Sequence, residues 1–167
     1  SLPGFLCCVF ESVYTKQVPA FIWKSGEEQP TLMAQKYIDT DEVKAQRVYR
    51  SIPKKMSEEA LTLIQDVFLS CLKDKEIKML NFLLLGYKEG KSVTKMLGHQ
   101  DVAPLLKAQR HFLHEAHLYT GFVRFADYGG TLAATISPKN FVLPYFTNHF
   151  VGRYSGEDFV IFDDVHK

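Results

Sequence analysis

A short aromatic stretch near the C-terminal end of the sequence contains side chains whose spacing could support chemistry. Tyr145, His149 and Arg153 are four residues apart, so a helix would place them on one face. A histidine one turn from an arginine can bind an anion such as phosphate, and it can act as a general base where a carboxylate orients it. The nearest carboxylates in the sequence are Asp163 and Asp164. His149 and the two aspartates are therefore the candidate catalytic residues, and Tyr145 and Arg153 are candidate binding residues.

The same stretch also has a simpler structural interpretation. Arg153 would pair with a strand-end aspartate and His149 would pack on aromatic rings. This interpretation is favoured, because ion pairs with a purely structural role are common. Asn140 lies just upstream of the expected helix and is a further candidate binding residue.

Arg124 is a separate basic candidate on an expected strand. An arginine there could contact a phosphate group of nucleic acid. Its neighbours Phe122 and Phe125 are better explained as core residues than as platforms for nucleic-acid bases.

The densest basic cluster in the sequence lies between residues 44 and 55. Arg47, Arg50 and Lys54 are candidate contacts to DNA or RNA, because such side chains neutralise phosphate charge. Lys44 and Lys55 belong to the same cluster. The alternative is an ordinary solvated helix face, since acidic residues at positions 39, 41 and 42 lie beside it. The net charge of +1 gives no strong field over the whole molecule, so a nucleic-acid partner would require a local patch of this kind.

The sequence shows no established pattern for a metal or a cofactor. His111, His114 and His117 are three residues apart, a spacing that drifts around a helix and does not bring all three to one metal. Glu115 follows His114, but Leu118 stands where a second histidine would complete the HExxH pattern. Glu115 and His117 could line a cleft or form an interior pair. Walker, GxGxxG, GxSxG and iron–sulfur cysteine patterns are also missing from the sequence, so no metal and no cofactor is predicted.

Length and composition indicate one ordinary globular domain. The 167 residues are enough to bury a sizeable core, and 46% of them are hydrophobic. The three cysteines form no CxxC motif, which favours free thiols and a cytoplasmic location over a disulfide framework. No apolar run reaches the length of a transmembrane helix, so no membrane association is predicted.

Hydrophobic periodicity and breaker residues predict helices followed by a small sheet. Expected helices cover residues 3–14, about 41–52, 57–72, 75–87, 92–98 and 104–119, with one more over 143–154. Asp39 or Thr40 is expected to cap the second helix, and Pro53 to end it. Expected strands cover 122–126, 132–136 and 159–162, with a hairpin turn at 127–130 and a further short strand at 37–38. This order predicts an α+β fold over 1–167, in which a helical layer (about 1–119) packs on a small antiparallel β-sheet (about 120–167).

Several segments resemble a bacterial family assigned to DNA metabolism, whose core is a domain of unknown function. The segments are GFLCCVFESVYTK (4–16), IDTDEVKAQRVYRSIPKKMSEEAL (38–61), EAHLYTGFVRF (115–125), ISPKNFVLPYFTNHFVGRY (136–154) and FVIFDDVH (159–166). The family is typically encoded beside a radical-SAM protein thought to modify or repair DNA. Related domains are fused to uracil-DNA-glycosylase-like proteins. The resemblance therefore implies a role in DNA modification or repair.

The resemblance carries over motif residues without assigning them roles: Arg124 in GFVRF, Asn140 in PKNxVLP, His149 and Arg153 in HFxxR, and Asp163 in FDDxH. The family's chains usually begin with an upstream strand ending in Asp-Gly and continue past FDDxH with helical sequence, so this chain is expected to be truncated at both ends. The leading hypothesis is a DNA-metabolism accessory protein that binds nucleic acid, a radical-SAM partner, or both. The alternatives are a DNA-acting hydrolase or glycosylase with His149 as base, and a protein-interaction module without catalysis.

Overall fold

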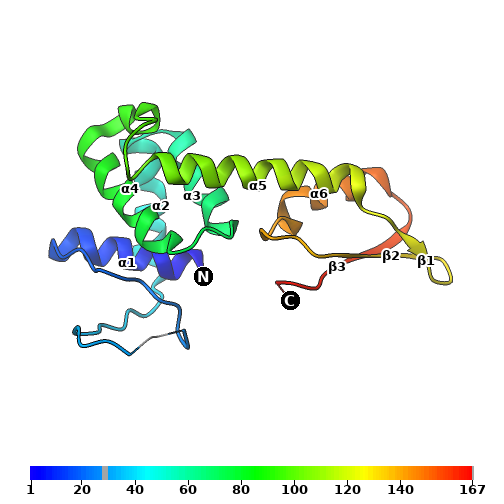
Figure 1. Cartoon of the computed structure of the whole chain (residues 1–167), viewed down its shortest axis with the longest axis horizontal. Helices are drawn as coiled ribbons and strands as arrows, with labels where there is room; N and C mark the ends of the chain where they lie inside the picture. Colours follow the sequence, from blue (N-terminus) through cyan, green and yellow to red (C-terminus); the bar gives the residue numbers. More distant parts are fainter. Residues whose placement is uncertain (28–29, 167) are drawn as a thin grey trace. The chain divides into compact units, whose positions relative to one another are not determined.

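The computed structural model describes residues 1–27 and 30–166 (Figure 1). Contacts between residues divide the chain into two compact units. Unit 1 comprises Ser1–Phe68 and Leu72–Leu106, and unit 2 comprises Leu69–Cys71 and Lys107–Lys167. Helices dominate and the strands form one small sheet, so the predicted α+β class is confirmed.

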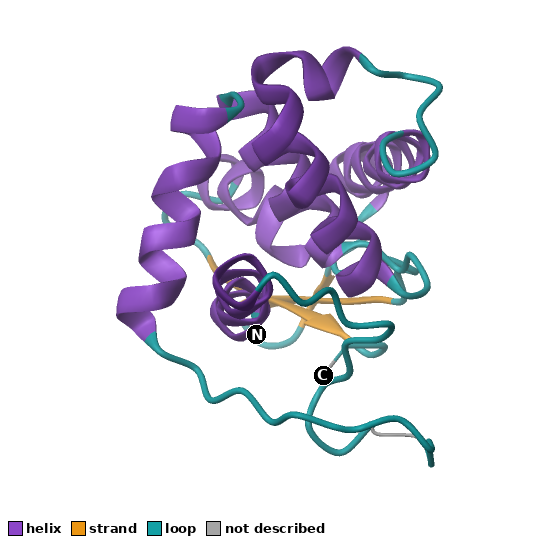
Figure 2. Ribbon diagram, turned by 90° about the vertical axis from the view of Figure 1, so that its left-hand side faces the viewer, coloured by secondary structure: helices purple, strands orange, loops and turns teal. Residues whose placement is uncertain are grey.

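Every regular element of unit 1, within its described residues, is a helix. These are α1 (Leu2–Thr15), α2 (Glu42–Lys55), α3 (Glu58–Leu69), α4 (Lys75–Glu89) and the 3-10 helix η1 (Gly90–Lys95). Apolar residues at helical spacing bury one face of each α-helix, as the periodicity predicted. The connection between α1 and α2 contains neither helix nor strand in its described residues, so the strand expected at 37–38 is not formed (Figure 2).

The boundaries of α2 differ from the prediction at both ends. The N-cap is Asp41, whose carboxylate accepts hydrogen bonds from the backbone N–H groups of Val43 (2.9 Å) and Lys44 (3.1 Å), instead of the predicted Asp39 or Thr40. Pro53 lies inside the helix instead of ending it. It falls in the last turn, where the missing N–H removes a single helical bond. The helix then closes with a 2.8 Å bond from Met56 N–H to the carbonyl of residue 52.

Unit 2 contains most of α5 (Ala103–Phe122), followed by β1 (Ala126–Asp127), β2 (Thr131–Ile136), α6 (Leu143–Arg153) and β3 (Asp158–Asp163). The strand expected at 122–126 is largely wrong, because α5 continues to residue 122 and only residue 126 enters β1. Gly129 and Gly130 form the hairpin turn with φ of 66° and 95°, a conformation that favours glycine.

The sheet has the order β1-β2-β3 and is mixed rather than antiparallel. The hairpin β1–β2 is antiparallel, as predicted, whereas β2 and β3 pair in parallel from Thr131↔Asp158 to Ile136↔Asp163. The parallel pairing follows from the connection between them, because α6 carries the chain back before β3 begins.

The core of unit 2 lies between α5, α6 and the sheet. Buried residues from α5, β2 and α6 form one cluster, and rings such as Phe125 pack against it. Phe122, by contrast, is 70% exposed, so only one of the two predicted core neighbours of Arg124 is in the core. The fully or nearly buried members of the cluster are Phe112, Ala116, Ile136, Val142, Phe146 and Phe150.

Candidate functional site

Polar side chains gather in unit 2 where the parallel strands end. Asp163, the last residue of β3, is 5% exposed. Its Oδ1 accepts hydrogen bonds from the backbone N–H groups of Val165 (3.0 Å) and His166 (3.1 Å). Its Oδ2 lies 2.9 Å from Nδ1 of the His166 ring. A buried carboxylate requires partners of this kind. The contact between Oδ2 and the ring nitrogen also fixes the orientation of the imidazole.

His166 was not among the residues singled out from the sequence. Where Nδ1–H donates to Asp163, Nε2 is the ring nitrogen left for another partner. The side chain is 26% exposed, and its ring lies 5.4 Å from the ring of Phe141. The signal that could have identified it is the Asp-x-x-His spacing directly after an apolar strand, since that spacing lets a turn return the imidazole to the carboxylate.

Asn140 is held by a network that joins three segments of unit 2. Its Nδ2 and its backbone N–H both donate to Oε2 of Glu115, at 2.6 Å and 2.9 Å, and Lys139 N–H donates to Oε1 at 2.9 Å. Its Oδ1 accepts from the backbone N–H of Cys71 at 2.8 Å. Asn140 is 5% exposed. These bonds use the carboxylate and the amide to join α5, the loop before α6, and the segment 69–71.

Tyr119 links this network to the strand ends. Burial of the phenol and then the nearby Glu115 carboxylate raise the pKa of Tyr119, while a hydrogen bond with the Ser137 backbone opposes the rise. Asp163 and Asp164 raise the same pKa further. Tyr119 therefore stays protonated in the neighbourhood of three carboxylates. We call Glu115, Tyr119, Asn140, Asp163 and His166 the strand-end cluster.

The histidine and arginine predicted on the 143–154 helix lie on α6. His149 is exposed and packs edge-on against Phe150, with ring centroids 5.1 Å apart. Arg153 lies over the ring of Tyr154 at 5.8 Å, and it forms no ion pair with a strand-end aspartate among the described residues. The packing half of the simpler interpretation is thus confirmed for His149, whereas the expected Arg153 ion pair is not present.

Tyr145 and Arg124 occupy other parts of the surface of unit 2. Tyr145 is 53% exposed and rests edge-on against Phe112, with centroids 5.5 Å apart. Arg124 is exposed in the short connection between α5 and β1. Neither side chain has a hydrogen bond to the strand-end cluster within the described ranges. Their binding roles stay predictions.

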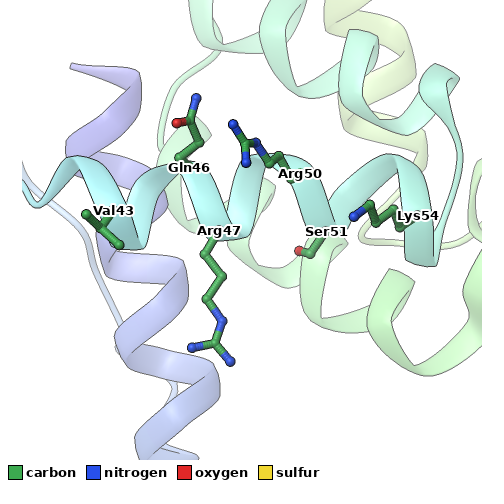
Figure 3. A pocket seen from close by; sticks show the side chains of 6 residues that line it. All are labelled: Val43, Gln46, Arg47, Arg50, Ser51 and Lys54. Carbon is green, nitrogen blue, oxygen red and sulfur yellow. The ribbon is translucent and has the colours of Figure 1, made fainter.

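In unit 1, three of the predicted phosphate contacts line one hollow on α2. Arg47, Arg50 and Lys54 are exposed and surround it together with Val43, Gln46 and Ser51 (Figure 3). The hollow has a volume of about 450 Å³. Figure 3 shows the three cations spaced along α2, with Arg47 extending beside α1. We call this surface the α2 face.

The charges of the α2 face are not neutralised by neighbouring acids. In the described part of the chain, Arg47, Arg50 and Lys54 form no ion pair, whereas Lys44 lies 4.0 Å from the carboxylate of Asp41. Ser51, which lines the hollow, has a hydroxyl that lies 2.6 Å from the Tyr87 hydroxyl and donates to the Val48 carbonyl at 2.7 Å. Burial raises the pKa of Tyr87, so its hydroxyl stays protonated.

The described residues offer neither a group of metal ligands nor a helix that could span a membrane. Across residues 1–27 and 30–166, no three His, Cys, Asp or Glu side chains are grouped so that they could hold a metal ion. Over the same residues, no helix has both the length and the apolar character needed to cross a membrane.

Comparison with known proteins places part of the chain in a family. Residues 73–167 match the model of a domain of unknown function, DUF4130. No curated protein and no solved structure matches the chain. The matched residues include the whole strand-end cluster, whereas the α2 face precedes them. Because the match covers more than half of the sequence, the chain belongs to the DUF4130 family.

Proposed function

We propose that this protein is an accessory factor of DNA modification or repair that binds the nucleic-acid backbone with its α2 face. The observation that carries the proposal is the hollow lined by Arg47, Arg50 and Lys54. Three exposed cations without an acidic partner retain their full attraction for phosphate, whereas cations already paired with carboxylates do not. The resemblance to a DNA-metabolism family supports DNA as the polyanion.

The spacing of the cations suits a continuous backbone. Arg47 and Lys54 are seven residues apart on one helix, which corresponds to roughly 10 Å along its axis. Successive phosphates of one duplex strand advance by about 3.4 Å along the DNA axis, so a run of several phosphates fits this length. Arg50, between them, adds a third contact to the same run.

The test replaces all three cations by alanine and measures DNA binding by fluorescence anisotropy over a range of salt concentrations. The wild-type protein should show a log–log salt slope near −2 to −3, because three contacts contribute about −0.7 to −0.9 each. The triple variant Arg47→Ala/Arg50→Ala/Lys54→Ala should lose most of this slope and most of its affinity.

The matched control removes the same charge from exposed residues of unit 1 outside the hollow. Lys73→Ala/Lys91→Ala/Lys95→Ala serves this purpose, since these exposed lysines do not line the hollow and form no ion pair among the described residues. Equal losses in the two triple variants would show that only net charge matters, and the α2 face would then be the wrong surface. Unchanged binding in the first variant would give the same conclusion.

We further propose a radical-SAM protein as the protein partner, on the basis of the family resemblance alone. The two proteins should still purify together as a complex after nuclease treatment. Loss of the complex once nucleic acid is removed would reduce this proposal to a shared affinity for DNA.

A second candidate function is catalysis on DNA, and the specific observation that favours it is the Asp163–His166 hydrogen bond of 2.9 Å. A carboxylate that orients an imidazole and leaves Nε2 accessible is the arrangement that a general base requires. His149 has no such carboxylate within the described chain. In this second candidate the base is therefore His166, and His149 has no catalytic role.

Labelled single-stranded and duplex oligonucleotides, with and without uracil, provide the assay for strand cleavage and abasic-site formation. His166→Gln should abolish any activity, whereas His149→Gln should retain it. Both variants should keep the fold of the wild-type protein. The reverse pattern would restore the original assignment to His149. A wild-type protein without activity on any of these substrates would eliminate the candidate.

A further inference from the structure

An exposed aromatic stack lies on α1 beside the α2 face. Phe10 and Tyr14 are one helical turn apart, and their rings are stacked with centroids 6.0 Å apart and an interplanar angle of 7°. Phe10 is half-buried, whereas Tyr14 is 78% exposed. The stack therefore ends in a flat ring that faces solvent, although a ring of this size gains free energy when it is covered.

Two cations join the stack to the basic hollow. The guanidinium carbon of Arg47 lies 5.8 Å from the centre of the Phe10 ring, and Nζ of Lys44 lies 5.7 Å from the same point. Arg47 also lines the hollow. The aromatic stack and the phosphate-binding cations thus form one continuous surface over α1 and α2, both of which belong to unit 1.

We infer that the ligand of this surface is single-stranded nucleic acid, with a base stacked on Tyr14 and the backbone held by Arg47, Arg50 and Lys54. The inference rests on the proposed function, which it narrows from DNA in general to unpaired strands. A basic groove combined with an aromatic platform is the arrangement that binds single strands without sequence preference, since every base has a π-face.

Duplex DNA cannot use the whole surface. Its bases are stacked on one another inside the helix, so Tyr14 meets only the sugar–phosphate exterior. The cations of the α2 face can bind the backbone of either form. The two surfaces therefore make separable contributions: the cations act on both forms, and Tyr14 acts on the single strand alone.

The experiment uses a fluorescein-labelled 16-nucleotide strand of mixed sequence, alone and annealed to its complement, with anisotropy as the readout. Tyr14→Ala should weaken binding of the single strand by roughly 5- to 150-fold, the range expected for loss of one base–aromatic stack. Binding of the duplex should change by less than about 2-fold, because no base can reach residue 14. Tyr14→Phe should bind both forms like the wild-type protein, since the ring is retained.

Tyr37→Ala is the matched control, because Tyr37 lies in unit 1 and is 76% exposed. It should leave both affinities unchanged. Equal binding of the single strand by wild-type protein and Tyr14→Ala would overturn the inference, and so would equal weakening of both forms. Failure of the proposed function looks different: the triple cation variant would then bind like the wild-type protein, whatever the effect at Tyr14.

Discussion

The hydrogen bonds of Asn140 in the strand-end cluster allow a quantitative prediction, because its side chain both donates and accepts inside unit 2. Asn140→Ala removes the 2.6 Å bond from Nδ2 to Glu115 and the 2.8 Å bond from Cys71 N–H to Oδ1. The backbone bonds from Lys139 and residue 140 to Glu115 are not removed by the substitution. The variant therefore tests how much the side chain of Asn140 contributes to the junction of three segments.

The size of the effect follows from the two lost bonds. A hydrogen bond to a charged acceptor contributes about 1.5–3 kcal/mol and a neutral one about 0.5–1.5 kcal/mol. Because Asn140 is only 5% exposed, water cannot easily replace either partner. We expect Asn140→Ala to lower the free energy of unfolding by about 3 kcal/mol. At roughly 2–4 °C per kcal/mol for a chain of this length, the melting temperature should fall by roughly 6–12 °C.

Asn140→Asp adds a dependence on pH whose sign can be stated. The introduced carboxyl would face the Glu115 carboxylate, and this like charge raises the pKa of the introduced carboxyl in the folded protein. The introduced carboxyl has a pKa of about 3.9 in the unfolded chain and a higher pKa in the folded protein. The variant therefore regains stability once the pH is below about 3.9, and it loses this stability as the pH rises through the folded pKa. The difference from the wild-type protein should therefore be large at pH 7 and small near pH 3.5.

Urea unfolding followed by circular dichroism gives the free energies, and hydrogen exchange of the peptides covering 69–71 and 139–142 locates the change. Asn148→Ala is the control, since Asn148 is exposed on α6 and should cost less than about 0.5 kcal/mol. A wild-type stability for Asn140→Ala, or a loss for Asn140→Asp that does not shrink at low pH, would refute the account of the network.

Two further predictions concern packing and a surface ion pair. A Cβ at Gly86 would clash with the sulfur of the fully buried Met56, whereas a Cβ at Gly152 meets nothing within 4 Å. Gly86→Ala should therefore be less stable than Gly152→Ala by about 1–3 kcal/mol in thermal unfolding. The hydrogen bond from Lys36 lowers the pKa of Glu11, and Lys36→Met should raise that pKa in an NMR titration. An unchanged titration of Glu11 would show that the pair does not form in solution.

The helices were predictable where one apolar stripe persisted, and the same rule explains the main error. Phe122-Val123-Arg124-Phe125 is rich in β-branched and aromatic residues and precedes a Gly-Gly turn, so it resembles a strand. The apolar positions Phe112, Ala116, Tyr119 and Val123, however, continue at helical spacing into the core of unit 2. The longer helical pattern prevails over the short strand-like run, so α5 extends to residue 122.

The direction of β3 was also available from the sequence. A helix was expected between the second and third strands, and a strand–helix–strand connection returns the chain to a parallel position. The antiparallel expectation treated the three strands as a simple meander. The role of Asn140 was not available, because its Oδ1 partner Cys71 lies 69 residues away in the sequence. Contacts at that separation depend on the fold as a whole and leave no local pattern.

The candidate sites differ in the same way. Arg47, Arg50 and Lys54 follow the period of one helix, so their shared face was predictable before the fold was known. Asp163 and Asp164 were the carboxylates nearest in sequence that could orient His149, but the turn after β3 brings His166 to Asp163 instead. The contact between Asp163 and His166 spans three residues after a strand and depends on the geometry of a turn. An amino-acid sequence indicates turn geometry less clearly than it indicates helix periodicity.

The family match covers one of the two proposed functional surfaces and not the other. The strand-end cluster lies within residues 73–167, whereas Tyr14 and the α2 face lie before residue 73. If nucleic-acid binding belongs to α1 and α2, a DUF4130 protein that lacks equivalents of these helices should not bind single strands through this surface. The matched part contains the contacts in which Asp163 orients His166 and Glu115 holds Asn140. Comparing the His166→Gln and Tyr14→Ala variants separates a role of the matched part from a role of the residues that precede it.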